Sequence, residues 1–321
     1  LVFGNVPFSL TFNPPASVQF YPIYGTLPRP GRLSRVFAGV PPGPDYEDAG
    51  PALITIDPKL RTPYAVQWNL NVQREVASGL GLEVGYYATR GVKQLRNRDV
   101  NQAVYLPGAT YLDVFDRRPT QLVGLTYLLE GVDPGGIDLV QQQEAAATST
   151  YHSMQARLSG RLRDRLSTLV SYTWSHAIDD ASDVFGFTGS SGFPQDSNNL
   201  AAEKGNAPFD IRHRLTASFT WDLPGEGRLW GGWQTNGIFT AQSGAPFTVR
   251  LGTDAALDGN PFNEQRPNVV PGAFVEDGRG GLILTVPREQ LIPAPGTYGN
   301  LGRNTFRGPE FVNVDASVFK T

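Results

Sequence analysis

The sequence contains no cysteine, which excludes disulfide frameworks, thiolate metal sites and cysteine nucleophiles together. It is also poor in charge, with 18% charged residues against about 25% in an average soluble domain. The net charge is -3 and Lys and Arg form no run, so nucleic acid is not an expected partner. No apolar stretch approaches the ~20 residues that a membrane-spanning helix needs. These absences exclude a helical membrane protein.

Groups for catalysis are scarce as well. The three histidines, His152, His176 and His213, form no H-x-x-H or H-E-x-x-H arrangement, so a zinc site or a histidine base has little support. Ser243-Gly244-Ala245 is not a G-x-S-x-G nucleophile elbow, and Gly278-Arg279-Gly280-Gly281 lacks the strand and helix that flank a phosphate loop. We expect no cofactor and no metal, and the sequence predicts a protein that is not an enzyme.

One acidic segment leaves an alternative open. Asp179, Asp180 and Asp183 could supply oxygen ligands to Ca²⁺, but the Gly and distal Glu of an EF-hand loop are missing. A capped turn or a solvated loop is the favoured interpretation.

Glycine and proline are abundant, with 36 and 26 residues, which favours turns and loops over helices. Between them lie segments in which apolar and polar residues alternate, the period of a half-exposed β-strand. From Tyr64 to Val76, for example, Val66, Trp68 and Leu70 alternate with polar residues. Seven such runs are predicted as strands: 64–76, 80–89, 153–162, 168–175, 212–223, 233–249 and 312–318.

The third run is the ambiguous one, because its apolar residues from Met154 to Leu166 are also spaced four apart, as on a helix. A core-facing helix would need apolar residues at the i+3 positions too, and Arg157 and Arg161 stand there. A strand is therefore favoured.

The sixth run is the least regular. Gly237 and Ile238 exchange the faces that the alternation assigns to them, so the register of this strand is open.

Length and spacing of the runs favour a membrane barrel. Most runs reach the ~9 to 11 residues that cross a bilayer at barrel tilt. The connections alternate between short (77–79, 163–165, 224–232) and long (91–149, 179–208, 252–307), as periplasmic turns and extracellular loops do in bacterial barrels. The sequence predicts an all-β, antiparallel transmembrane β-barrel segment in the cell outer membrane of a Gram-negative type bacterium, with 1–61 as an extracellular loop region and 62–321 as strands and loops.

Aromatic residues offer a check, because barrels carry aromatic girdles at both membrane interfaces. Their places in the runs favour girdles over the alternative, the core of a soluble β-sandwich with glycan-binding loops. The predicted outer girdle holds Tyr64, Tyr151, Trp174 and Phe209, and the inner one Trp221, Trp230 and Trp233.

Several charged residues fall on the polar, lumen-facing side of the predicted strands. They could line a solute path or pair with one another, and pairing is favoured because inward charges on a barrel wall need balancing. These candidate binding residues are Arg157, Arg161, Arg212, Arg214, Glu83 and Asp222.

An ordered set of motifs, from about Ile54 to the end, resembles the C-terminal barrel part of Oar-like TonB-dependent receptors. The motifs are Thr62-Pro63-Tyr64, Gln67-Trp68-Asn69-Leu70, Gln73-Arg74, Gly85-Tyr86, Arg90-Gly91, Tyr172-Thr173-Trp174-Ser175, Phe209-Asp210-Ile211-Arg212-His213-Arg214, Gln242-Ser243-Gly244-Ala245-Pro246-Phe247, Gly302-Arg303-Asn304 and Arg307-Gly308-Pro309.

The resemblance implies a barrel of about 22 strands around a plug, energised by TonB. Neither the plug nor a TonB box is in this sequence, so we expect the chain to be a fragment of the barrel wall. The resemblance further implies import of a small solute, peptide or glycan, with TonB and outer-membrane lipid as partners. The alternative on the same fold is an outer-membrane structural or adhesion protein without transport activity.

Overall fold

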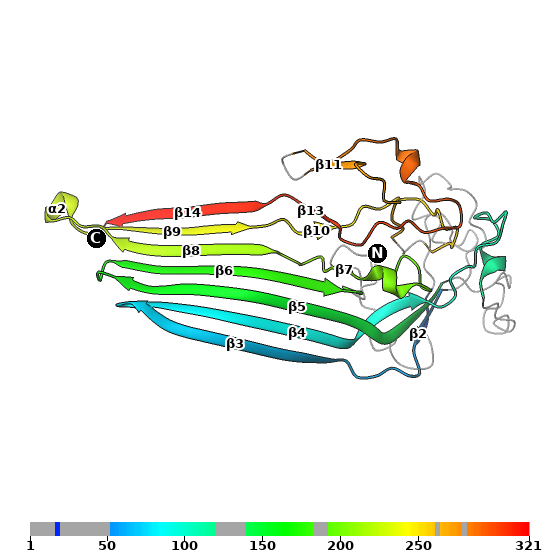
Figure 1. Ribbon diagram of the computed structural model, residues 1–321, viewed down its shortest axis with the longest axis horizontal. Helices are drawn as coiled ribbons and strands as arrows, with labels where there is room; N and C mark the ends of the chain where they lie inside the picture. The colour runs from blue at the N-terminus through cyan, green and yellow to red at the C-terminus, as the bar shows by residue number, and fades with distance from the viewer. Residues whose placement is uncertain are drawn as a thin grey trace, which may run out of the picture.

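The computed structural model describes residues 17–19, 52–119, 139–182, 192–260, 264–277 and 281–320. Within these residues the protein is nearly all β-sheet, and one large, mainly antiparallel sheet dominates it (Figure 1). No helix among them is long and apolar enough to cross a membrane.

Seven long strands form the body of this sheet, and each coincides with one of the seven alternating runs. Each pairs antiparallel with the next along the chain, and the register shifts only near the turn between β3 and β4 and in the β4–β5 pair beyond Gly91. The third run is a strand, so the helical alternative is wrong. The strands are β3 (Tyr64–Ala77), β4 (Leu80–Asp99), β5 (Val140–Leu162), β6 (Leu166–Asp179), β8 (His213–Asp222), β9 (Trp233–Gln242) and β14 (Phe311–Lys320).

The connections separate cleanly between the two ends of the sheet (Figure 1). The short ones lie at one end, the turn end, where the four-residue helix α2 (Gly227–Trp230) joins β8 to β9. The long ones gather at the other, the loop end. The predicted alternation of short and long connections is thus confirmed.

The first short turn shows why its residues are needed. Gly79 has a φ of +76°, which a side chain would strain, and its carbonyl accepts the amide of Arg161 at 2.9 Å. A Cβ placed on Gly160 would come within 2.0 Å of that same carbonyl oxygen. The glycine at position 160 therefore lets β5 lie close to the turn between β3 and β4.

One face of the sheet is apolar from edge to edge. A single row of register partners crosses all seven strands and contains no charged residue. Its members are exposed or half-exposed although apolar, and neighbours on the same face reach 70% at Leu70 and 66% at Val314. The row runs Val72, Val84, Ala156, Tyr172, Leu215, Ala241 and Val312.

The adjoining row, one residue closer to the turn end on each strand, lies on the opposite face and is polar throughout. Because successive side chains of a strand point to opposite faces, the sequence alternation becomes one apolar and one polar surface. The polar row runs Gln73, Glu83, Arg157, Ser171, Thr216, Thr240 and Asn313.

The sixth run required a correction. Its strand β9 ends at Gln242 rather than Val249, and the residues beyond form β10 (Pro246–Phe247), which pairs with β13 (Phe306–Arg307) outside the large sheet. Its register continues without a bulge, so Gly237 lies on the apolar face and Ile238 on the polar one. A Cβ on Gly237 would meet the ring of Phe219 at 2.5 Å, so glycine makes room for that ring.

The strands β4 and β5 run further toward the loop end than predicted. Residues 92–99 and 140–148 were assigned to a long loop, but they continue the two strands past a pair of register shifts. At 20 and 23 residues both strands exceed the ~9 to 11 that cross a bilayer. We therefore place the part of β4 beyond about Gly91 outside the membrane-spanning segment.

Two short strands precede the seven, in a region where only loop was expected. Strand β2 (Ala52–Ile56) pairs parallel with the start of β5, and β1 (Ser17–Gln19) pairs antiparallel with β2. The predicted loop region 1–61 thus contributes strands at the loop end.

The remaining elements belong to the connections of the loop end. Strand β7 (Gly205–Asn206) pairs with β6, and β11 (Phe274–Glu276) pairs with β12 (Leu282–Leu284). The 3-10 helices in the described part of these connections are η1 (Phe115–Arg117), η3 (Leu200–Glu203) and η4 (Arg288–Leu291).

Candidate functional site: a polar loop layer over one end of the sheet

We call the folded connections at the loop end, residues 100–119, 192–212, 243–260, 264–277 and 281–310, the loop layer. Among the described residues, more of the buried ones are polar or charged than apolar, and most of these lie in the loop layer or in the strand ends beneath it. A buried polar group is costly unless it is hydrogen-bonded, so the layer depends on how completely its charges are paired.

A bidentate ion pair joins two distant loops at the centre of the layer. Arg266 donates from Nη1 and Nη2 to the two carboxylate oxygens of Glu203, both at 2.9 Å, and from Nε to the carbonyl of Leu301 at 2.9 Å. The side chains are 3% and 5% exposed. Gln195 completes the unit, because its amide donates to Glu203 and its Oε1 accepts the amide of Arg266.

A second network surrounds a partly buried tyrosine. The hydroxyl of Tyr298 donates to Oδ2 of Asp258 at 2.6 Å and accepts from Nε2 of Gln102 at 2.6 Å. That side-chain amide also donates to Asp196 at 3.0 Å. Burial raises the pKa of Tyr298, with the carboxylate of Asp258 adding to the effect, so the phenol stays protonated and acts as a donor.

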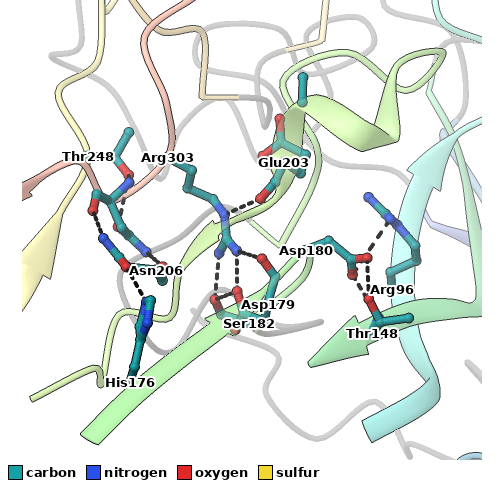
Figure 2. Close-up of polar contacts among 12 residues, drawn as sticks. Arg96, Thr148, His176, Asp179, Asp180, Ser182, Glu203, Asn206, Thr248 and Arg303 are labelled. Atoms are coloured by element: carbon teal, nitrogen blue, oxygen red, sulfur yellow. Dashed lines mark hydrogen bonds and ion pairs between the residues drawn. The ribbon is translucent and has the colours of Figure 1, made fainter. Parts of the chain in front are cut away.

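The layer is fastened to the end of β6 through Arg303. Its guanidinium pairs with the carboxylate of Asp179 and donates to the carbonyls of Asp179 and Glu203 and to the hydroxyl of Ser182 (Figure 2). Asp179 and Arg303 are 124 residues apart in the sequence. This contact ties the last loop to a strand end.

A parallel fastening holds the start of β8. The carboxylate of Asp210, fully buried, pairs with Arg307 and with Arg212, and accepts the amide of Ala177 at 2.7 Å. Arg307 also donates to the carbonyl of Gly244 at 3.1 Å.

Between these two fastenings lies an amide pair. The Nδ2 atoms of Asn206 and Asn304 each donate to the other residue's backbone carbonyl, at 3.0 and 2.7 Å. Asn304 further contacts Thr248, and Asn206 contacts His176 (Figure 2). Together with Asp179, Asp210, Arg303 and Arg307, these two asparagines form what we call the strand-end network.

The strand-end network gives a physical meaning to several of the motifs behind the Oar-like resemblance. Those around Asp210, Gly244, Arg303 and Arg307 lie far apart in the sequence but meet here. Glycine is required at Gly244, because a Cβ there would come within 1.8 Å of the carbonyl oxygen of Gly308. These motifs hold the loop layer on the strands.

A cleft opens beside these contacts, in the angle between the extended end of β4, the end of β6 and the loop layer. Its volume, as space open to the centre of a water-sized group, is about 30 Å³. Three arginines and three carboxylates are among the residues that line it, Arg96, Arg266, Arg303, Asp180, Glu203 and Glu264, together with Gln195 and Phe193.

Arg96 differs from the other two arginines of the cleft. Its side chain is 4% exposed, yet its closest charged partners are Glu144 at 3.8 Å and Asp180 at 4.0 Å, both beyond hydrogen-bond reach. Among the residues that the structure describes, its Nε has no hydrogen-bond partner. Burial lowers the pKa of Arg96, and the nearby carboxylates oppose this shift.

Both carboxylates beside Arg96 also interact with other groups of the protein. Asp180 accepts both the amide and the hydroxyl of Thr148, at 2.8 and 2.9 Å (Figure 2). Glu144 lies between two arginines, with Arg98 at 3.7 Å on its other oxygen. The guanidinium is thus held close to negative charge without direct contact.

The predicted lumen-face residues do not form one site. Arg157 lies opposite Glu83 in the polar row. Arg161 pairs with Asp222 at 4.0 Å, as predicted, and also donates to the carbonyl of Asp164 in the turn.

The other two arginines of that set lie toward the loop end. Arg214 is the second residue of β8, opposite Thr173 and Gln242. Arg212 directly precedes β8, where its carbonyl accepts the amide of Ser175 at 3.0 Å, and its side chain belongs to the strand-end network through Asp210.

Two girdle predictions differ in outcome at the loop end. Trp174 lies on the apolar face, 46% exposed. Tyr151 lies on the opposite face, with Thr89 and Ala177 as its register partners, so its assignment to the outer girdle is wrong.

The histidines have structural partners. The hydroxyl of Tyr86 and Nδ1 of His152 are 2.6 Å apart, and those of Tyr172 and His213 are 2.8 Å apart, with the rings stacked in both pairs. His176 contacts Asn206 at 3.1 Å.

In the acidic segment, the carboxylates of Asp179 and Asp180 accept from side chains of this chain, Asp179 from Ser182 and Asp180 from Thr148. Asp183 lies outside the described residues. No group of three or more metal-ligating side chains occurs in the described part of the chain.

Sequence reasoning missed the central residues of the layer, Glu203, Arg266, Arg303 and Arg307. Only the last two stood in a motif, and a motif does not reveal its partner. The available signal was the presence of arginine and acidic residues in loops that are otherwise rich in glycine and proline.

Comparison with known proteins agrees with this architecture. Residues 2–321 match the family model described as outer membrane beta barrel domain. The chain belongs to this family. As a member of the outer membrane beta barrel domain family, the protein is located in the outer membrane, and its apolar row of exposed side chains faces lipid, as predicted.

One solved structure, the outer membrane transporter YddB from Escherichia coli, is similar with a TM-score of 0.39 and 9% sequence identity. The similarity covers 65% of this chain and 24% of YddB, so the chain spans about a quarter of that protein's length. A search of curated proteins found no match.

Proposed function

We propose that the protein is part of the barrel wall of a TonB-dependent, Oar-like outer-membrane receptor, which binds a solute at the loop end and imports it. The observation that carries this proposal is the loop layer itself. Long connections are costly to order, and these are ordered by buried ion pairs that link segments 63 to 124 residues apart.

A barrel that served only as a membrane anchor would not need such a layer. Ordered loops above a barrel present fixed side chains to the medium, which is what selective binding requires. The cleft lies in the same layer, at the junction of loops and strand ends. The Oar-like motifs support energised uptake, because receptors of that type depend on TonB.

The test is a comparison of three strains: wild type, a strain lacking the full-length gene, and a strain lacking TonB. Each is grown in a defined mixture of small solutes, and depletion of the medium is measured by mass spectrometry. We expect one solute to remain in the medium of both mutants and to be depleted by wild type. Depletion that depends on the gene but not on TonB would overturn the proposal.

A second candidate, a structural or adhesion protein, is favoured by one observation. The segment 104–112 exposes apolar side chains, with Leu112 at 74% and Tyr111 at 61%, on the side away from the membrane. Such residues suit contact with another macromolecule. This function predicts lost cell contact in the gene deletion and an unchanged medium.

A further inference from the structure

The charges that line the cleft beside Arg96 restrict the kind of ligand it can bind more than its volume does. Among the described residues that line it, three side chains carry positive charge and three carry negative charge, so their charges balance. An anion would be attracted by Arg96 but would also meet the carboxylates of Asp180 and Glu264. A cation would meet three guanidinium groups. The balance disfavours a ligand that carries a net charge.

The three arginines of the cleft also differ in how many of their N–H donors are bonded to protein acceptors. Arg266 and Arg303 donate to protein acceptors from Nε and both terminal nitrogens. Within the described part of the chain, the contacts of the Arg96 guanidinium with charged groups are the two long ones, to Glu144 and Asp180, and Arg96 borders the cleft. It is therefore the donor in the cleft that has bonding capacity to offer.

Of the two long contacts, the one between Arg96 and Asp180 joins two residues that line the cleft, and it defines the group that fits there. At 3.8 and 4.0 Å a guanidinium and a carboxylate are too far apart to bond directly. A group that joins them must accept from the guanidinium and donate to the carboxylate. A hydroxyl does both, whereas a carboxylate or phosphate can only accept and an ammonium can only donate.

The volume of the cleft agrees with this chemistry. One water-sized group occupies about 10 to 15 Å³ in the same measure, so 30 Å³ holds about two hydroxyl groups. The remainder of the ligand would extend outward from this space, and Phe193, which also lines the cleft, would supply an aromatic side chain on its wall.

We propose that this cleft binds a neutral, hydroxyl-rich solute of the saccharide class, with Arg96 and Asp180 holding its hydroxyl edge. The proposal deepens the proposed function, on which it rests for the claim that the bound solute is the imported one. Binding itself requires only the loop layer, so the two can fail separately.

The experiment uses the full-length protein in detergent micelles and ligand-detected NMR titration. The probes are glucose, galactose, mannose and maltose, with glucuronate and glucosamine as charged counterparts of glucose. We expect at least one neutral sugar to bind and both charged counterparts to bind at least tenfold more weakly than the tightest neutral sugar.

Variants then locate the site. Arg96→Met and Asp180→Asn should each weaken binding of that sugar at least tenfold, and Arg96→Lys should weaken it less than Arg96→Met. Arg161→Met, at the turn end, is the matched control and should bind like wild type. Hydrogen exchange at Asn268 and Leu301 verifies in each variant that the loop layer is folded.

The proposal is overturned if none of the neutral sugars binds, if a charged counterpart binds more tightly, or if Arg96→Met binds like wild type with its loop layer folded. Sugar binding without TonB-dependent depletion would leave this inference standing and remove the proposed import. TonB-dependent depletion of a solute without hydroxyl groups would do the reverse.

Discussion

Removing the guanidinium at the centre of the loop layer should open the layer without unfolding the sheet. Arg266 and Glu203 are each about 95% buried, and Arg266→Met leaves the carboxylate of Glu203 without its charged partner. Breaking a buried pair in this way costs about 3 to 5 kcal/mol. Since about 1.4 kcal/mol is a factor of ten, the opening equilibrium should increase roughly 100- to 4,000-fold.

The assay is amide hydrogen exchange followed by mass spectrometry, which measures local opening directly. The reporters are the amides of Asn268 and Leu301, which donate to the carbonyls of Leu291 and Pro267 at 2.8 and 3.0 Å. Amides within β6 serve as an internal reference and should keep their protection. The double variant Arg266→Met/Glu203→Gln should lose less protection than the sum of its two single changes.

Arg161→Met is the control, because it removes a guanidinium by the same substitution at an exposed position. Its pair with Asp222 is long and half exposed, so its loss should cost less than about 1 kcal/mol. The reasoning is refuted if Arg266→Met leaves Asn268 and Leu301 protected, or if Arg161→Met exposes them equally.

Three further predictions concern the membrane face, the tyrosine network and pH. Leu70→Arg places a charge on the lipid-facing row and should destabilise the barrel by about 2 to 4 kcal/mol in reversible unfolding from lipid vesicles, whereas Leu229→Arg, exposed in α2, should cost almost nothing. Tyr298→Phe removes the donor to Asp258 and should lower loop-layer protection by about 1 to 3 kcal/mol, and full protection would contradict the network. Burial raises the pKa of Glu264 above its unfolded value, so its stabilising contribution is present at low pH and is lost as pH rises through the folded pKa. Glu264→Gln should therefore gain loop-layer protection relative to wild type between pH 4 and pH 7, and a constant ratio across that range would contradict the shift.

The strands were predictable because the signal for them is local. Each crossing strand has lipid on one side and a polar surface on the other, so the chain alternates residue by residue wherever it crosses. The same logic explains the error at Tyr151, an aromatic residue that follows the polar parity of β5. Alternation decides the face, and residue type alone does not.

Where the strands leave the membrane, the local signal stops. The end of β4 buries both Arg96 and Asn97, consecutive residues on opposite faces, because loops cover it. Those loops are held by partners such as Arg303 and Asp179, which pair across 124 residues. No periodicity encodes such a pairing, so the extended strand ends, the strand-end network and the cleft could not be predicted.

The central claim is that the seven strands form a membrane wall with one lipid-facing and one polar surface. The 321 residues contain no cysteine, so single cysteines along β3 can carry a nitroxide spin label, whose collision rates with oxygen and with a water-soluble nickel chelate are measured in lipid vesicles. We predict that both rates oscillate with a period of two and in opposite phase, oxygen being high at Val66, Leu70 and Val72 and nickel at Gln67, Asn69 and Asn71. Rates that vary in phase, or with a period near 3.6, would contradict the account.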